Sequence, residues 1–156
     1  MKKIVVIFIS ILAFSSVAFA KKEVISFDLK FGFLKGGEAK LVINDTLYNG
    51  KKAVHYYVEG RTTGLTDKLF SVNDIYESTV DAETRLPYKS IRNVRERKYR
   101  YYNETFFYHD IDSIYSQRSG WREAPHNLVD IVSVFFYFVE HHLMEDIQSG
   151  QKVTLP

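Results

Sequence analysis

The sequence NLVDIVSVFFYFVEHHLMEDIQ, residues Asn127–Gln148, decides the fold, because it is the one long helical pattern among short strand-like segments. Its polar residues recur at spacings of three and four, which places them on one helix face. The other positions are mostly apolar, so this helix needs a broad apolar partner, and only the preceding strands supply one. We predict a helix with Asn127 as N-cap, Asp130 completing a capping box, and Gly150 just beyond its end.

The first twenty residues, MKKIVVIFISILAFSSVAFA, have the three parts of a secretory signal. Two lysines precede an apolar run, and small residues lead to Ala18-Phe19-Ala20, a typical cleavage pattern. The alternative is a membrane anchor, but the apolar core is short for a span and Lys21 follows it at once. We predict a cleaved leader, an exported mature chain of residues 21–156, and no transmembrane anchor after cleavage.

Charge and composition narrow the function of the mature chain. The two lysines of the leader account for the formal net charge of +2, so the remainder is balanced and a general attraction to nucleic acid has no support. The chain has no cysteine, which excludes disulfides, thiolate nucleophiles and cysteine-based metal sites. Aromatic residues make up 15% of the chain, which favours a ring-rich interior.

The region before the helix follows a two-residue alternation typical of strands with one buried face. Val24–Phe33 alternates cleanly, and we expect a turn at Lys35-Gly36-Gly37 and a hairpin at Asn49-Gly50. Thr62–Lys68 is predicted as a loop. The further predicted strands are Ala39–Leu47, Lys52–Arg61, Leu69–Val80, Tyr88–Val94, Tyr99–Tyr102, Phe106–His109 and Ile111–Gln117, followed by a loop from Ser119 to Pro125.

This order predicts an α+β fold that is mostly antiparallel β. We expect a single domain over residues 21–156: a curved open sheet, or half-barrel, with one long C-terminal apolar helix packed in its concave face. At Val153-Thr154-Leu155-Pro156 a new strand begins just where the sequence stops. Its partner strand either belongs to another molecule or follows in a longer protein; we favour the second, with a domain incomplete at its C-terminus.

The stretch Ser71–Tyr88, SVNDIYESTVDAETRLPY, resembles exported bacterial proteins that contain the domain of unknown function 3108. The run Ser113–Leu143, with Trp121 and Pro125, resembles the same family. Members of that family are similar to the half-barrels of outer-membrane lipoprotein carriers, in which helices cap a curved antiparallel sheet. The resemblance implies an envelope protein of a Gram-negative bacterium, in the periplasm or at the inner face of the outer membrane. It implies a hydrophobic interior and supplies no catalytic residues.

Candidate catalytic and metal-binding groups are sparse. Ser133 and Asp130 are the only nominated catalytic pair, and helix capping explains Asp130 more simply; no G-x-S-x-G motif is present. His141 and Glu145 lie four residues apart on one helix face, but a third metal ligand is not indicated. We expect no enzyme activity, no metal and no cofactor.

The segment from Arg85 to Arg100 is rich in basic and aromatic residues. Such a mixture is typical of polyanion binding. For an exported protein, lipid headgroup phosphates or acidic polysaccharide are better candidates than nucleic acid. The alternative is a solvated hairpin face whose charges discourage edge pairing. The candidate anion-binding residues are Arg92, Arg95, Arg97 and Arg100.

Two functional hypotheses follow. In the first, the protein binds a lipid or acyl-bearing ligand between the curved sheet and the helix. The candidate lining residues are Phe27, Leu29, Phe31, Phe33, Phe135 and Phe138. In the second, it is a structural or interaction module with a packed interior, which contacts other envelope proteins through its surface or through the basic hairpin of residues 85–100.

Overall fold

The structure, a computed structural model, describes residues 21–140. The predicted leader, the His141 and Glu145 pair, and the strand expected near residue 153 lie outside these residues. The predicted helix is described only as far as Glu140.

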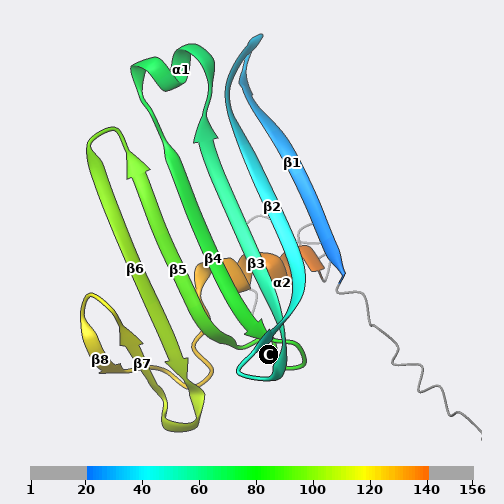
Figure 1. Ribbon diagram of the computed structural model, residues 1–156, viewed down its shortest axis with the longest axis vertical. Coiled ribbons are helices and arrows are strands. Elements are labelled where there is room, and N and C mark those ends of the chain that lie inside the picture. The colour runs from blue at the N-terminus through cyan, green and yellow to red at the C-terminus, as the bar shows by residue number, and fades with distance from the viewer. Residues whose placement is uncertain (1–20, 141–156) are drawn as a thin grey trace, which may run out of the picture.

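Eight antiparallel strands form one open sheet, and each strand pairs with its neighbour in the chain (Figure 1). This meander agrees with the predicted antiparallel sheet. The strands are β1 (Lys22–Phe31), β2 (Leu34–Tyr48), β3 (Lys51–Thr62), β4 (Asn73–Asp81), β5 (Pro87–Glu96), β6 (Tyr99–Tyr108), β7 (Ser113–Ser116) and β8 (Gly120–Glu123).

Two turns show where local sequence chemistry decides the chain's path. Asn49 and Gly50 both have positive φ, as a two-residue hairpin requires, and they join β2 to β3 as predicted. The predicted turn at Lys35-Gly36-Gly37 is wrong: the chain turns at Gly32, whose φ is +59°, and Phe31 pairs with Leu34. Gly37 instead lies within β2, where a Cβ would approach the carbonyl oxygen of Arg61 to 2.7 Å.

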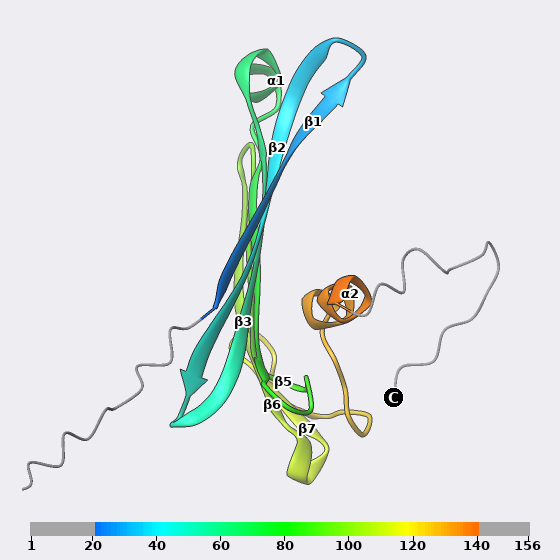
Figure 2. The same ribbon diagram turned by 90° about the vertical axis from the view of Figure 1, so that its right-hand side faces the viewer.

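The two faces of the sheet differ in what covers them. Helix α2 (Ile131–Glu140) packs on the face we call the helix side; the opposite face is the outer side (Figure 2). It contacts β3 and β4 and crosses behind the strands as drawn in Figure 1. A buried cluster joins the two layers, and it consists of Leu41, Val54, Tyr56, Val80, Val132 and Phe136.

The start of α2 corrects the predicted helix. Asn127 has a φ of +53° and is not the N-cap. Asp130 caps the helix instead, because its Oδ1 accepts hydrogen bonds from the backbone N–H groups of Val132 (2.8 Å) and Ser133 (3.1 Å). The helix therefore begins three residues later than expected, at Ile131, and its described part ends at Glu140. Two further short helices are present: α1 (Gly64–Leu69) where a loop was predicted, and a 3₁₀ turn at His109–Ile111.

Candidate functional site

A buried polar contact fixes the first turn of α2 to the sheet. The hydroxyl of Ser78 on β4 donates to Asp130 Oδ2 at 2.6 Å. Burial raises the pKa of Asp130, although the hydrogen bonds from Ser78 and the helix N-terminus act in the opposite direction. Ser133 Oγ accepts from the backbone N–H of Asp130 at 3.2 Å, which makes the cap reciprocal, and donates to the backbone carbonyl of Asp130 at 2.9 Å. Both nominated catalytic residues thus have structural hydrogen bonds.

A second contact fixes the far end of α2. The rings of Phe136 and Tyr56 stack with centroids 4.4 Å apart, and Tyr56 donates its hydroxyl to Glu140 at 2.9 Å. Arg85 lies 3.5 Å from the other carboxylate oxygen of Glu140. Burial, together with the neighbouring charge of Glu140, raises the pKa of Tyr56. α2 is therefore held at both of its described ends, with space remaining beside it.

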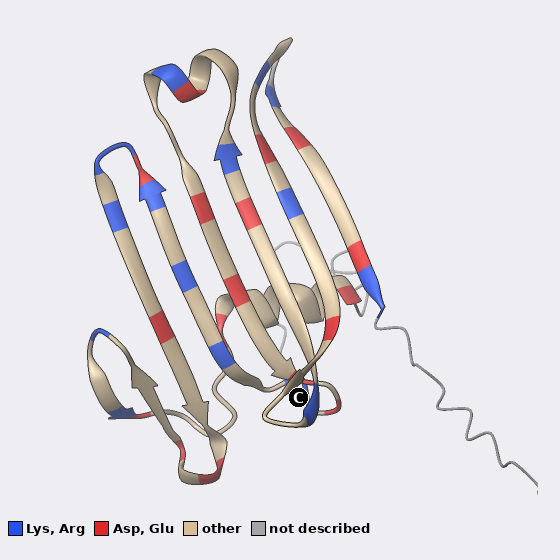
Figure 3. Ribbon diagram, viewed as in Figure 1, with Lys and Arg blue, Asp and Glu red and all other residues tan. Residues whose placement is uncertain are grey.

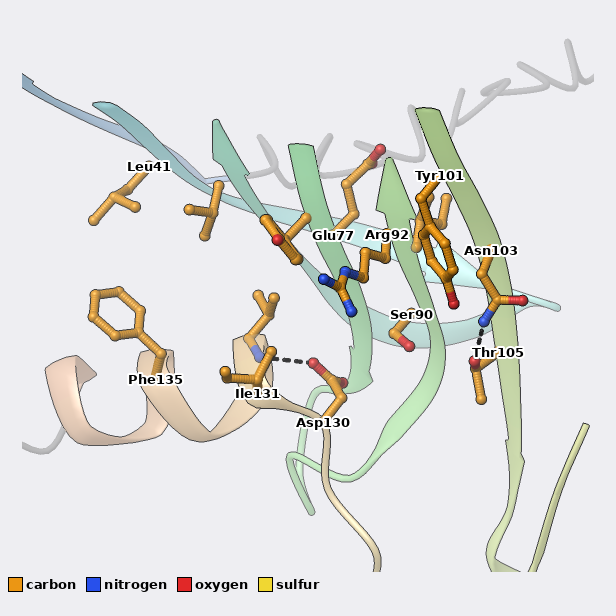
Figure 4. Close-up of a pocket in the computed structure, with 14 residues that line it drawn as sticks. Leu41, Glu77, Ser90, Arg92, Tyr101, Asn103, Thr105, Asp130, Ile131 and Phe135 are labelled. Carbon is orange, nitrogen blue, oxygen red and sulfur yellow. Dashed lines mark hydrogen bonds between the residues drawn. The ribbon is translucent and has the colours of Figure 1, made fainter. Parts of the chain in front are cut away.

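That space is a cavity of about 580 Å³ between the first turns of α2 and strands β2 to β6 (Figure 4). We call it the α2 cavity. Its volume is within the usual range of small-molecule sites. It is lined by Leu41, Val58, Tyr76, Glu77, Ser90, Ile91, Arg92, Tyr101, Asn103, Thr105, Asp130, Ile131, Val132 and Phe135.

The α2 cavity has an apolar end and a polar end. In Figure 4, Leu41 and Phe135 lie at one end, whereas Tyr101, Asn103 and Thr105 lie at the other, with Arg92 between them. Strand register produces this division, because Arg92 is opposite Tyr76 on one side and Asn103 on the other. The cavity could therefore accept a molecule that is itself apolar at one end and polar at the other.

Within residues 21–140, the contacts of the Arg92 guanidinium are with aromatic rings. Its guanidinium carbon lies 5.7 Å from the ring centroid of Tyr76 and 5.1 Å from that of Tyr101. Arg118 approaches the ring of Tyr101 as well, at 4.8 Å. Across residues 21–140, the hydrogen bonds and ion pairs that the structure defines do not include the Arg92 side chain.

The predicted lining residues are dispersed. Phe135 lines the α2 cavity, whereas Phe138 is half-buried and does not. Leu29, 51% exposed, lines a neighbouring groove of about 820 Å³ that shares Val58 and Tyr76 with the cavity. Phe27 borders a third hollow on β1 to β3. Phe33 is 94% exposed because the turn at Gly32 removes it from the strand, and the side chain of Phe31 is not described.

The cavity residues that the sequence analysis did not select nevertheless follow a recognisable strand pattern. Leu41, Val58 and Tyr76 follow the same two-residue alternation as β1 and occupy one register row across β2, β3 and β4. The choice of β1 over these strands depended on where the helix crosses the sheet, which strand alternation does not specify.

The four predicted anion-binding arginines do not form one site. Arg92 is in the α2 cavity, whereas Arg95 and Arg100 are opposite one another near the β5–β6 turn. Arg97 lies in that turn over the ring of Phe70, and Arg100 donates to the carbonyls of Arg97 and Tyr99. Figure 3 shows the basic positions gathered around this turn.

Within residues 21–140, no three His, Asp or Glu side chains are grouped as metal ligands would be. Neither described helix has the length and apolar character needed to cross a bilayer.

Comparison with known proteins gives one match. The sequence profile of a family described as "Protein of unknown function (DUF3108)" matches residues 26–156, which confirms the resemblance seen in Ser71–Tyr88. No curated protein and no solved structure matches the chain.

Proposed function

The chain belongs to the DUF3108 family, and we propose that it is a non-catalytic protein of the bacterial envelope that binds a hydrophobic ligand, a lipid or other acyl-bearing molecule, between its sheet and α2. In this proposal the sheet is the wall of a half-barrel and α2 is its cover. The leader-like residues 1–20 support export, and the mostly apolar walls of the α2 cavity support an acyl-bearing ligand.

One observation carries the proposal: a cavity of about 580 Å³ remains beside a helix that is firmly anchored at both of its described ends. The cavity is open to solvent, and its wall includes exposed apolar side chains of α2, Ile131 (79% exposed) and Phe135 (38% exposed), which a bound hydrophobic molecule would cover. Most of the walls are apolar, as in sites for small hydrophobic molecules. The neighbouring groove with Leu29 extends the apolar surface toward β1.

The test begins with the full chain, exported and purified from an envelope fraction. Mass spectrometry of the solvent extract should identify acyl-bearing molecules at near-stoichiometric amounts. A titration with the apolar fluorescent probe N-phenylnaphthylamine should give saturable binding.

The variant Phe135→Asp places a charge in the cavity wall and should weaken probe binding at least tenfold. Leu65→Asp is the matched control, because Leu65 is 71% exposed on α1 and does not line the cavity. Extracts free of lipid together with unsaturable probe binding would contradict the proposal.

A second candidate function, contact with an anionic envelope partner through the basic hairpin, has one observation in its favour. Arg95 and Arg100 are directly opposite each other, a like-charge pairing that costs stability. Within residues 21–140 the Arg95 side chain has no carboxylate partner. Arg95→Glu should then abolish sedimentation with vesicles containing phosphatidylglycerol, while probe binding in the cavity stays unchanged.

A further inference from the structure

We infer that the α2 cavity selects an anionic single-chain amphiphile, whose carboxylate or phosphate headgroup binds Arg92 and whose chain lies along Leu41, Val58 and Phe135. This inference rests on the proposed function and adds the chemical class of the ligand. It brings together one predicted anion-binding residue and one predicted lining residue in a single site.

The Arg92 side chain is available to a ligand, because no hydrogen-bond or ion-pair partner within residues 21–140 occupies its guanidinium. The rings of Tyr76 and Tyr101 hold the guanidinium by cation–π contact, which leaves its N–H donors unused. Arg92 is exposed, so water solvates the charge in the free protein. A planar guanidinium with free donors binds carboxylate or phosphate through two parallel hydrogen bonds.

The neighbouring polar residues complete a headgroup site. Asn103 is fixed, because its Oδ1 accepts from Ser116 Oγ (3.0 Å) and from the backbone N–H of Arg118 (3.1 Å). Its amide nitrogen consequently faces Thr105 Oγ1, to which it donates at 3.1 Å. Thr105 therefore acts as acceptor in that bond and keeps its own hydroxyl proton for another partner, such as a headgroup oxygen.

The two carboxylates in the cavity wall, those of Glu77 and Asp130, do not neutralise the positive charge of Arg92. Glu77 pairs with His55 at 2.8 Å, and Figure 4 shows its side chain directed away from Arg92. Asp130 is engaged by Ser78 and the α2 N-terminus, and burial shifts it toward its neutral form. Arg118, on the same tyrosine ring as Arg92, adds a second positive charge at this end. The local charge thus favours an anion over a neutral or cationic headgroup.

The geometry also sets the direction of the chain. The exposed Arg92 places the headgroup near water, whereas Leu41 is 8% exposed and Val58 packs against the buried cluster. From Val58 the apolar surface continues into the groove that holds Leu29. An acyl chain that starts at Arg92 can follow this path and bury its methylene groups against apolar side chains.

The experiment uses the full chain and three ligands with the same twelve-carbon chain: dodecanoate, dodecyl phosphate and dodecanol. Displacement of N-phenylnaphthylamine measures each affinity. The wild-type protein should bind one or both anions at least tenfold more tightly than dodecanol, and the preferred anion distinguishes a fatty-acid from a phosphate headgroup. Arg92→Gln should abolish this preference and change dodecanol affinity less than twofold.

Arg122→Gln is the matched control, because Arg122 is an exposed arginine on β8 and lies outside the cavity; it should leave all three affinities unchanged. Unfolding midpoints verify that both variants fold. Equal binding of all three ligands by the wild type, or an equal loss of all three in Arg92→Gln, would overturn the inference and leave the proposed function standing. Failure of all three ligands and of the probe to bind would overturn both.

Discussion

The covered and the open parts of the helix side follow the same strand alternation yet have opposite environments. Under α2, Tyr56 and Val80 are at most 1% exposed, whereas Phe27 and Leu29 on β1 are about half exposed. Both sets occupy positions that alternation assigns to one face. Alternation therefore determines which way a side chain points, and the path of the helix determines whether it is buried.

This comparison distinguishes the residues that stabilise the fold from the residues that would bind a ligand. The covered part holds the buried cluster and both anchors of α2, so it should dominate the free energy of unfolding. The α2 cavity lies at the boundary between the two parts. Substitutions at the boundary should change binding more than stability, and the predictions below follow from this division.

The largest effect is expected in the covered part. Phe136→Ala removes a side chain that is fully buried and stacked on Tyr56, so it should lower the free energy of unfolding by about 3–5 kcal/mol. Urea denaturation followed by tyrosine fluorescence measures the loss. The neighbouring Phe135→Ala is the matched control: Phe135 is 38% exposed, and this variant should cost about 1 kcal/mol while weakening probe binding. Similar losses in both variants would contradict the division.

The anchor at Asp130 should rank second. Asp130→Ala removes the N-cap and leaves the fully buried Ser78 hydroxyl without its acceptor, at a combined cost of about 2 kcal/mol. Asp110→Ala, an exposed aspartate in the 3₁₀ turn, should cost at most a quarter as much. A loss equal to that of the control would show that α2 does not depend on this anchor.

Asp130→Asn adds a test of pH dependence. Because burial raises the pKa of Asp130, the folded protein holds this proton to a higher pH than the unfolded chain does. The wild type should therefore lose stability relative to Asp130→Asn as the pH rises from about 4 through the raised pKa. A constant difference across that interval would contradict the assigned direction.

A smaller effect with the opposite pH dependence is expected in the turn between β4 and β5. A hydrogen bond from Tyr88, with others from Thr84 and Glu83, lowers the pKa of Asp81 to about 2. Asp81→Asn should cost about 1–2 kcal/mol at pH 7. The cost should shrink as the pH falls from about 4 toward 2, because the wild-type carboxylate is then increasingly protonated as well. Paired urea titrations at pH 7 and pH 2.5 measure it: the cost at pH 2.5 should be less than half of the cost at pH 7, and an undiminished cost would contradict the assignment.

The smallest effect is expected at the tip of the open part. Phe33 is 94% exposed in the β1–β2 turn, so Phe33→Ser should change the free energy of unfolding by less than about 0.5 kcal/mol. Thermal unfolding of the two proteins at matched concentration is sufficient to test this. A loss above 1 kcal/mol would mean that this ring is covered in solution.

The sequence predicted strand alternation and the Asn49-Gly50 hairpin better than the positions at which strands begin and end. The alternation of β1 to β3 and the hairpin at Asn49-Gly50 are in place. The predicted break between Tyr102 and Phe106 is wrong, since β6 runs continuously from Tyr99 to Tyr108. The polar run there resembles a loop, but Asn103 and Glu104 have partners on neighbouring strands and turns. Likewise Gly120–Glu123 forms β8 rather than a loop, because Tyr115 and Trp121 pair across the hairpin.

The sequence predicted the chemical character of the candidate site but not which residues line it. Ring-rich strands and an apolar helix correctly indicated that sheet and helix would pack together. The cavity itself depends on contacts distant in the chain, such as Ser78 with Asp130 and Tyr56 with Glu140. Pattern and spacing contain no information about such pairs. The predicted lining residues therefore included β1, whereas strands β2 to β6 line the α2 cavity. The family motif in Ser71–Tyr88 has a physical basis in the turn that Asp81 organises.

The unbroken strand order of the sheet has a consequence for how the protein is made. Within residues 21–140 each strand pairs with its neighbours in sequence, so hairpins can form one after another with short loop closures. Docking of α2, by contrast, joins residues 52 and 84 positions apart. We therefore expect the cavity to be assembled late in folding, when a nearly finished sheet receives its helix. Because the chain is synthesised from its N-terminus, the apolar face of the sheet would be exposed before α2 has been made.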